Sequence, residues 1–147
     1  EENFPNRNYI GGGAASNWIT VGASNSSVDS LAAPFSNYGA EEVDLFAPGV
    51  QVLSTVPDGE WEPQDGTSMA APVVSGVAAL LMAYFPELGA AEVKEVLHES
   101  AVRYGGRNTA LPGEPGTVVP FDSLSATGSV VNAYEAVRRA LGGVQDR

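Results

Sequence analysis

Ser68 is the side chain in this sequence that is best placed for nucleophilic chemistry. It follows a turn-rich polar segment that ends at Gly66, and it precedes a run that is apolar or small almost without interruption to Phe85. A helix that is apolar on every face is typical of the middle of a domain, so we expect Ser68 in the first turn of a buried central helix. Backbone N–H groups there have no partner within the helix and the helix dipole is positive, so negative charge on a substrate oxygen would be stabilised. Gly66 would let the backbone adopt a conformation closed to other residues and let a ligand come close.

A serine at a helix start is commonly no more than a capping residue, and its position alone leaves both interpretations open. The surrounding string distinguishes them: Gly-Thr-Ser-Met-Ala-Ala-Pro-x-Val-Ser-Gly-x-Ala-Ala-Leu, from Gly66 onwards, strongly resembles the nucleophile segment of subtilisin-like serine proteases, the subtilases. The resemblance implies that Ser68 is the acylated nucleophile and that its own N–H helps to form the oxyanion hole. It also implies supporting roles for Gly66, for the Thr67 hydroxyl near the oxyanion, and for Met69 on the leaving-group side. Pro72 cannot donate to a carbonyl about four residues back, which would loosen the turn that carries Ser68.

Other segments resemble the same family in the same order. A strand ending in Val-Gly-Ala, a Ser-Asn-Tyr-Gly turn and an Asp-x-x-Ala-Pro-Gly strand precede the helix, and the resemblance covers roughly residues 18–141. Asp44 matches an aspartate that in relatives helps to bind a weak structural cation, so a calcium or other cation is one expectation there. A buried, hydrogen-bonded aspartate is the other, because calcium takes several oxygen ligands and no partner ligands are visible. The resemblance implies no cofactor for the chemistry itself.

A base that could activate Ser68 is not evident in this sequence. The single histidine, His98, is expected on the surface and about 13 Å from Ser68 if the helices on either side of Pro86 pack antiparallel. Lys94 fails as a partner for the same reason. In the family the triad aspartate and histidine, and the oxyanion-hole asparagine, precede the serine, so residues 1–147 are expected to form the C-terminal part of a single subtilase catalytic domain whose N-terminal part is absent. Alone, such a chain should be inactive.

The composition describes one globular domain. Of the 147 residues 44% are hydrophobic and 17% are charged, and there is no cysteine to form a disulfide or a thiolate site. The formal charge of −11 disfavours nucleic acid and anionic membranes as partners. The apolar run Met69–Phe85 is interrupted by proline and glycine and is shorter than the ~20 residues of a membrane span, which favours a core helix.

The expected fold is α/β, a mostly parallel sheet flanked by helices. After the central helix, we expect a second helix over Ala91–Val102 and a third over Ser129–Leu141, capped by Ser129 and ended by Gly142 and Gly143. The inward residues of the third helix are expected to be Val130, Ala133, Tyr134, Val137 and Leu141. Strands are expected over Trp18–Ala23, Val43–Gly49 and Val50–Val56, with a short one at Val118–Phe121.

The function that the resemblance implies is that of a secreted or cell-envelope serine endopeptidase, working by acyl transfer on a peptide or protein substrate. A sedolisin-like peptidase, which shares a Gly-Thr-Ser segment but uses a carboxylate base, is one alternative, although Met69 and the Asp-x-x-Ala-Pro-Gly strand favour the subtilase. A pseudoprotease or interaction module that keeps the fold without the base is the other. Strands that should cover part of the central helix would lie in the missing part, so exposed apolar surface and self-association are also expected.

Overall fold

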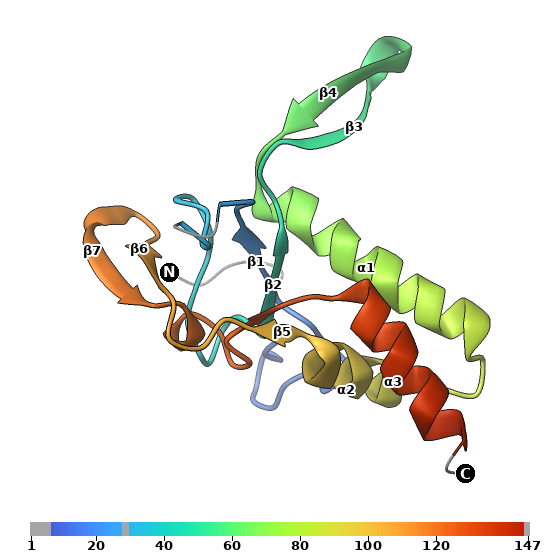
Figure 1. Cartoon of the computed structure of the whole chain (residues 1–147). Helices are drawn as coiled ribbons and strands as arrows, with labels where there is room; N and C mark the ends of the chain where they lie inside the picture. The colour runs from blue at the N-terminus through green and yellow to red at the C-terminus, as the bar shows by residue number, and fades with distance from the viewer. Residues whose placement is uncertain (1–6, 28–29, 146–147) are drawn as a thin grey trace.

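The computed structural model describes residues 7–27 and 30–145, and its centre is a small mixed sheet (Figure 1). Within the described residues the strand order in this sheet is β1-β2-β8-β5. Strands β1, β2 and β8 run parallel, and β5 is antiparallel to β8. The sheet strands are β1 (Val21–Ser24), β2 (Leu45–Pro48), β5 (Val102–Arg103) and β8 (Ser129–Val130).

Helices and two hairpins complete the described chain. The helices are α1 (Thr67–Tyr84), α2 (Ala90–Ser100) and α3 (Ala133–Gln145), with short 3₁₀ turns at Pro57–Gly59 and Phe121–Ser123. The hairpins are β3 (Val52–Val56) with β4 (Glu60–Gln64), and β6 (Asn108–Leu111) with β7 (Glu114–Pro120). The β3–β4 hairpin projects from the body as an arm just before α1 begins (Figure 1). The α/β fold class with a mostly parallel sheet is confirmed.

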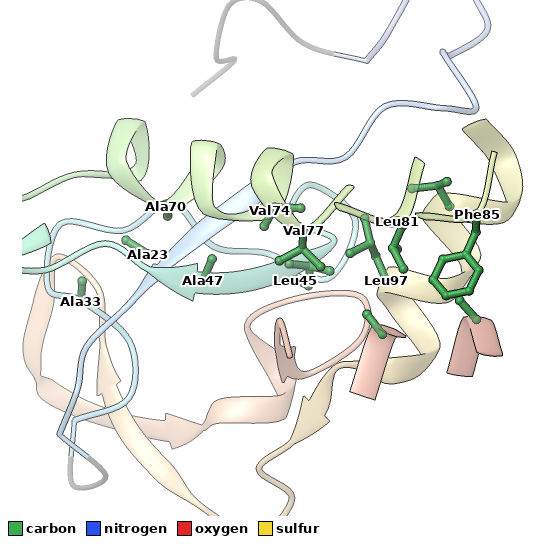
Figure 2. Close-up of a cluster of buried hydrophobic side chains, with 13 residues drawn as sticks. Ala23, Ala33, Leu45, Ala47, Ala70, Val74, Val77, Leu81, Phe85 and Leu97 are labelled. Atoms are coloured by element: carbon green, nitrogen blue, oxygen red, sulfur yellow. The ribbon is translucent and has the colours of Figure 1, made fainter. Parts of the chain in front are cut away.

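The three helices share one apolar core with β1 and β2. Small side chains in register on the two strands, Ala23 beside Ala47, allow α1 to approach the sheet closely. Figure 2 shows Ala70 of α1 over this pair, with Leu81 and Phe85 further along near Leu97 of α2. Because the buried residues of α2 and α3 join the same cluster, the helices cover one face of the sheet.

The other face of the sheet is covered by loops and the β6–β7 hairpin. Phe46 points away from the helices, and its ring lies 4.9 Å from that of Phe121, centroid to centroid. Gly22 of the neighbouring strand has no room for a side chain, since an added Cβ would lie 2.6 Å from the Phe46 ring. The Thr109 hydroxyl accepts from Ala32 N at 3.2 Å, which ties the hairpin to the loop after β1.

Helix α1 is apolar all round, as expected, but only one stripe of it is buried in this chain. Its buried residues are Ala70, Val74, Val77 and Leu81, while Leu80, Met82 and Tyr84 are exposed, in line with the expectation that part of this central helix is uncovered in these 147 residues. By length and composition alone α1 is also apolar enough to cross a membrane, a test that the core helix of a globular domain passes as well. The buried stripe packs against β1 and β2, as a core helix does.

The chain before α1 differs from the expectation in its strand pairing. The expected strand over Val50–Val56 exists as β3, but it pairs with β4 in the arm and not with the sheet. Strand β4 lies in the segment before Gly66 for which the sequence predicts turns, because Gly59 and Pro63 are typical turn residues. Cross-strand pairing, a non-local interaction, overrides that weak local preference.

Helix α3 begins later than expected. Ser129 is a buried strand residue, and the side chain of Asn132 caps the helix by accepting from Glu135 N at 3.0 Å. The inward residues are consequently Ala136 and Ala140, with Val137 half-buried, while the expected Tyr134 and Leu141 are 72% and 51% exposed. The helix also continues past Gly142 and Gly143 to Gln145, so these glycines do not end it despite the poor helix preference of glycine.

Candidate active site

Ser68 lies in the first turn of α1, as the sequence predicts. Thr67 is the first helical residue and Gly66 precedes the helix with φ 155°, a backbone conformation that side chains disfavour. The Gly66 carbonyl accepts from Met69 N at 3.1 Å and from Ala70 N at 3.3 Å, which closes the first turn around Ser68. The Ser68 side chain is exposed, so a nucleophile there is open to a substrate.

This helix start lies at the carboxyl end of the parallel strands. Gly49 follows the last residue of β2, and its carbonyl accepts from Gly66 N at 2.8 Å. A Cβ at Gly49 would lie 2.7 Å from both the Gly66 carbonyl oxygen and the Ala23 Cβ, so only glycine fits this contact. Ligands of parallel α/β sheets bind outside the carboxyl ends of the strands, which is where Ser68 is held.

The remaining residues of the predicted nucleophile segment lie in the same turn. Thr67 and Met69 are half-buried on either side of Ser68, and the Met69 sulfur packs against Gly66. Pro72 lies inside α1 and has no backbone N–H. The carbonyl of Ser68, four residues earlier, therefore lacks its usual helical donor. Gly66, Thr67, Ser68 and Met69 are thus brought together, and Asp44 is not among them.

Asp44 lies at the opposite end of β2, in a cluster of cationic side chains. Its carboxylate is buried and pairs with Arg7 at 3.1 Å and with Lys94 at 3.5 Å. It also accepts from Thr20 N at 2.7 Å. Of the two expectations for Asp44, these contacts support the buried, hydrogen-bonded carboxylate. Two cationic side chains hold this carboxylate, and the described residues contain no group of three or more His, Asp or Glu placed to bind a metal.

His98 is half-buried in this cluster, which corrects the expectation of a surface histidine. Its Nε2 lies 3.7 Å from the Asp44 carboxylate and, within the described chain, has no hydrogen-bond partner. Burial lowers the pKa of His98 below its ordinary value of 6.5; the Asp44 charge opposes this shift, and the Lys94 and Arg7 charges add to it. A carboxylate directly before a buried strand is a sequence signal for such a cluster, although it does not identify the partners.

His98 and Lys94 are both too far from Ser68 to activate it. Both residues contact Asp44, which directly precedes β2. Ser68 is held near Gly49, which directly follows β2. The five residue steps between Asp44 and Gly49 span roughly 16 Å at about 3.3 Å per residue of strand. The Lys94 ammonium is further fixed by the Trp18 carbonyl at 2.6 Å. This separation supports the exclusion of both residues as the base.

Known proteins resemble this chain in amino-acid sequence. The profile of the subtilase family, Peptidase S8, matches residues 6–134. Subtilisin DY of Bacillus licheniformis is 42% identical over 87 residues, which are 59% of this chain and 31% of that protein. Subtilisin-like protease 12 of Arthroderma gypseum is 42% identical over 110 residues, 73% of this chain and 27% of that protein.

Solved structures agree with the sequence comparisons. The subtilase cytotoxin SubAB structure matches with a TM-score of 0.66 at 28% identity, covering 85% of this chain and 37% of that one. The CspB protease of Clostridium perfringens matches with a TM-score of 0.65 at 29% identity, and the match covers 85% of this chain and 26% of that one. The chain therefore belongs to the subtilase family, which favours the subtilase over the sedolisin-like alternative. It spans about a third or less of the length of these curated relatives.

Proposed function

We propose that the protein to which this chain belongs is a serine endopeptidase and that Ser68 is its nucleophile. The observation that carries the proposal is the exposed Ser68 in the first turn of α1, held at the carboxyl edge of the sheet by the Gly66–Gly49 contact. Membership of the subtilase family, whose profile covers this segment, supports it. Residues 1–147 would then be one part of a single catalytic domain.

In this mechanism the Ser68 oxygen attacks the carbonyl carbon of the scissile peptide while a histidine takes the hydroxyl proton. The tetrahedral oxyanion would accept from the Ser68 N–H and be stabilised by the positive end of α1, with the Thr67 hydroxyl close by. The histidine then protonates the leaving amine, the C–N bond breaks, and a water molecule hydrolyses the acyl-enzyme. Met69 would pack on the leaving-group side.

The histidine, its aspartate and the oxyanion-hole asparagine would come from outside these 147 residues. His98 and Lys94 are at the other end of β2, and the chain covers only 31% of subtilisin DY. We therefore expect the 147-residue chain alone to lack peptidase activity. The chemistry needs no cofactor, and the substrate would be a peptide or protein.

Secretion or attachment to the cell envelope is part of the same proposal. The relatives include a protein named extracellular basic protease, from Dichelobacter nodosus, which is 40% identical over 105 residues. Detection of the protein in culture medium or envelope fractions would test it.

The test of the nucleophile is the Ser68→Ala variant of the full-length protein. Ser68 is exposed and the capping position is occupied by Gly66, so the unfolding free energy should fall by no more than ~1 kcal/mol. Fluorophosphonate labelling should disappear, and turnover should fall by about a million-fold, a size that is carried over from subtilisin variants. Substrate-like peptides should still bind.

Two outcomes would count against this assignment. If the label on the wild-type protein mapped to another serine, Ser68 would not be the nucleophile. If the folded wild-type protein bound peptides but took up no label, the pseudoprotease alternative would be favoured. Ser75→Ala, on the exposed side of the same helix, is the matched control and should label normally.

A further inference from the structure

The arm formed by β3 and β4 leaves the body and returns to it at one narrow base. It begins after Gly49 and ends directly before Gly66, so its two ends meet beside the nucleophile turn (Figure 1). Any movement of the arm would reach Ser68 through this base unless the base were held. Strands of an isolated hairpin are mobile compared with a packed core, which makes the base the point where rigidity is needed.

Two sets of hydrogen bonds hold the base. The Gly66 N–H donates to the Gly49 carbonyl at 2.8 Å, and the Gln51 N–H donates to the Asp65 carboxylate at 2.6 Å. The Gln51 side-chain amide donates to the same carboxylate oxygen at 3.3 Å. We name these contacts among Gly49, Gln51, Asp65 and Gly66 the base clamp.

The conformation of Gln51 shows that the clamp holds the backbone. Gln51 has φ 53°, the left-handed region that residues with side chains rarely adopt. Its N–H is thereby pointed at Asp65, and the short distance is typical of a hydrogen bond to a charged acceptor. The sequence alone gives no signal for this contact, because nothing local links Asp65 to a residue fourteen positions earlier.

We propose that Asp65 is a positioning residue for Ser68, acting through the base clamp. The clamp fixes Gly66, whose carbonyl accepts hydrogen bonds from the N–H groups of Met69 and Ala70. It thereby fixes the first turn of α1, in which Ser68 and its N–H lie. This inference rests on the proposed function, since it concerns the geometry of the acylation step. A nucleophile displaced by about 1 Å can lose about a hundred-fold in rate, so a modest loosening of this turn is measurable.

The experiment uses the full-length enzyme with Asp65→Ala, Asp65→Asn and Glu60→Ala. Asparagine keeps an oxygen that can accept from Gln51 N, whereas alanine does not. Glu60→Ala removes an exposed acidic side chain from β4, the strand that directly precedes Asp65, without touching the clamp, and it controls for the change in charge. The readouts are the rate of fluorophosphonate labelling of Ser68, KM and kcat for a peptide, the melting temperature, and hydrogen exchange of the peptide that spans Gln51 and Gly66.

We expect Asp65→Ala to slow labelling and kcat by ten- to a hundred-fold, on the order that such a displacement produces, with KM nearly unchanged. Exchange at Gln51 and Gly66 should accelerate in that variant, while Asp65→Asn and Glu60→Ala should stay close to wild type in all readouts.

Faster exchange with unchanged labelling in Asp65→Ala would overturn the proposal, as would equal slowing in Glu60→Ala. If Asp65→Ala fails to fold, the test rests on Asp65→Asn. Slower labelling of Ser68 in Asp65→Asn with unchanged hydrogen exchange would overturn the proposal, and wild-type labelling and exchange in that variant would support it. A wild-type enzyme that is not labelled at Ser68 would instead refute the proposed function.

Discussion

At the scale of single residues, His98 is a side chain whose charge depends on the fold. It faces the Asp44 carboxylate and the Lys94 and Arg7 cations from three different segments, and it is partly withdrawn from water. Burial is the largest influence, so its pKa in the folded chain lies below 6.5. The folded state therefore favours neutral His98, although an anion is close by.

This lowered pKa predicts how stability changes with pH. Below pH 6.5 the unfolded chain binds a proton that folded His98 resists, so the unfolding free energy should fall as pH drops from 6.5 towards the lower folded pKa. Urea unfolding of the wild type and of His98→Gln at pH 7.5 and pH 5.5, each condition about one unit from the ordinary pKa, measures this. The wild type should lose more stability on acidification than the variant. Equal losses would show that His98 titrates at its ordinary pKa.

At the scale of elements, Asp44 connects parts of the chain that are distant in sequence. Its carboxylate joins the start of β2 to Arg7 in the N-terminal segment, to the Thr20 N–H before β1, and to Lys94 on α2. Removing a buried carboxylate leaves its cationic partners uncompensated.

We expect Asp44→Ala to lower the unfolding free energy by about 3 kcal/mol, within the range for a broken buried ion pair. Glu99→Ala is the matched control: Glu99 pairs with Arg139 between α2 and α3, but both side chains are largely exposed, so its loss should cost less than ~1 kcal/mol. Denaturant titration of both variants measures the difference. Similar costs for the two would mean that the Asp44 cluster adds no more than a surface ion pair.

At the scale of the whole molecule, much apolar surface remains uncovered in these 147 residues. On α1 the exposed side chains include Met82 and Tyr84, at 53% and 74%, and on the arm Trp61 is 65% exposed. Monomeric proteins rarely expose large contiguous apolar patches. In the parent protein we propose that the rest of the catalytic domain covers α1.

The isolated 147-residue chain should therefore self-associate. Light scattering should give a mass above 15.2 kDa, the mass of one chain, and a hydrophobic dye should bind. Met82→Glu should shift the equilibrium towards the monomer, whereas Val118→Glu, on an exposed position of β7 away from α1, should not. A clean monomer that binds no dye would contradict the prediction.

The sequence by itself determined the family, the α/β class and the placement of Ser68 at a helix start. These depend on local information: a glycine before the serine, an unbroken apolar run after it, and short β-branched segments. The Gly66–Met69 turn is formed by residues that are neighbours in the chain, so their types and order were sufficient to predict it.

The tertiary structure decided what depends on distant contacts. It showed which stripe of α1 is buried, that β3 pairs with β4, that Asp44 meets Arg7 and Lys94, and that Asp65 holds Gln51. A helix that is apolar on all faces carries no signal for which face packs, and a lone carboxylate carries none for its partner. Only packing in three dimensions brings together Gln51 and Asp65, fourteen residues apart, or Asp44 and His98, fifty-four residues apart. It also placed His98 at the opposite end of β2 from Ser68.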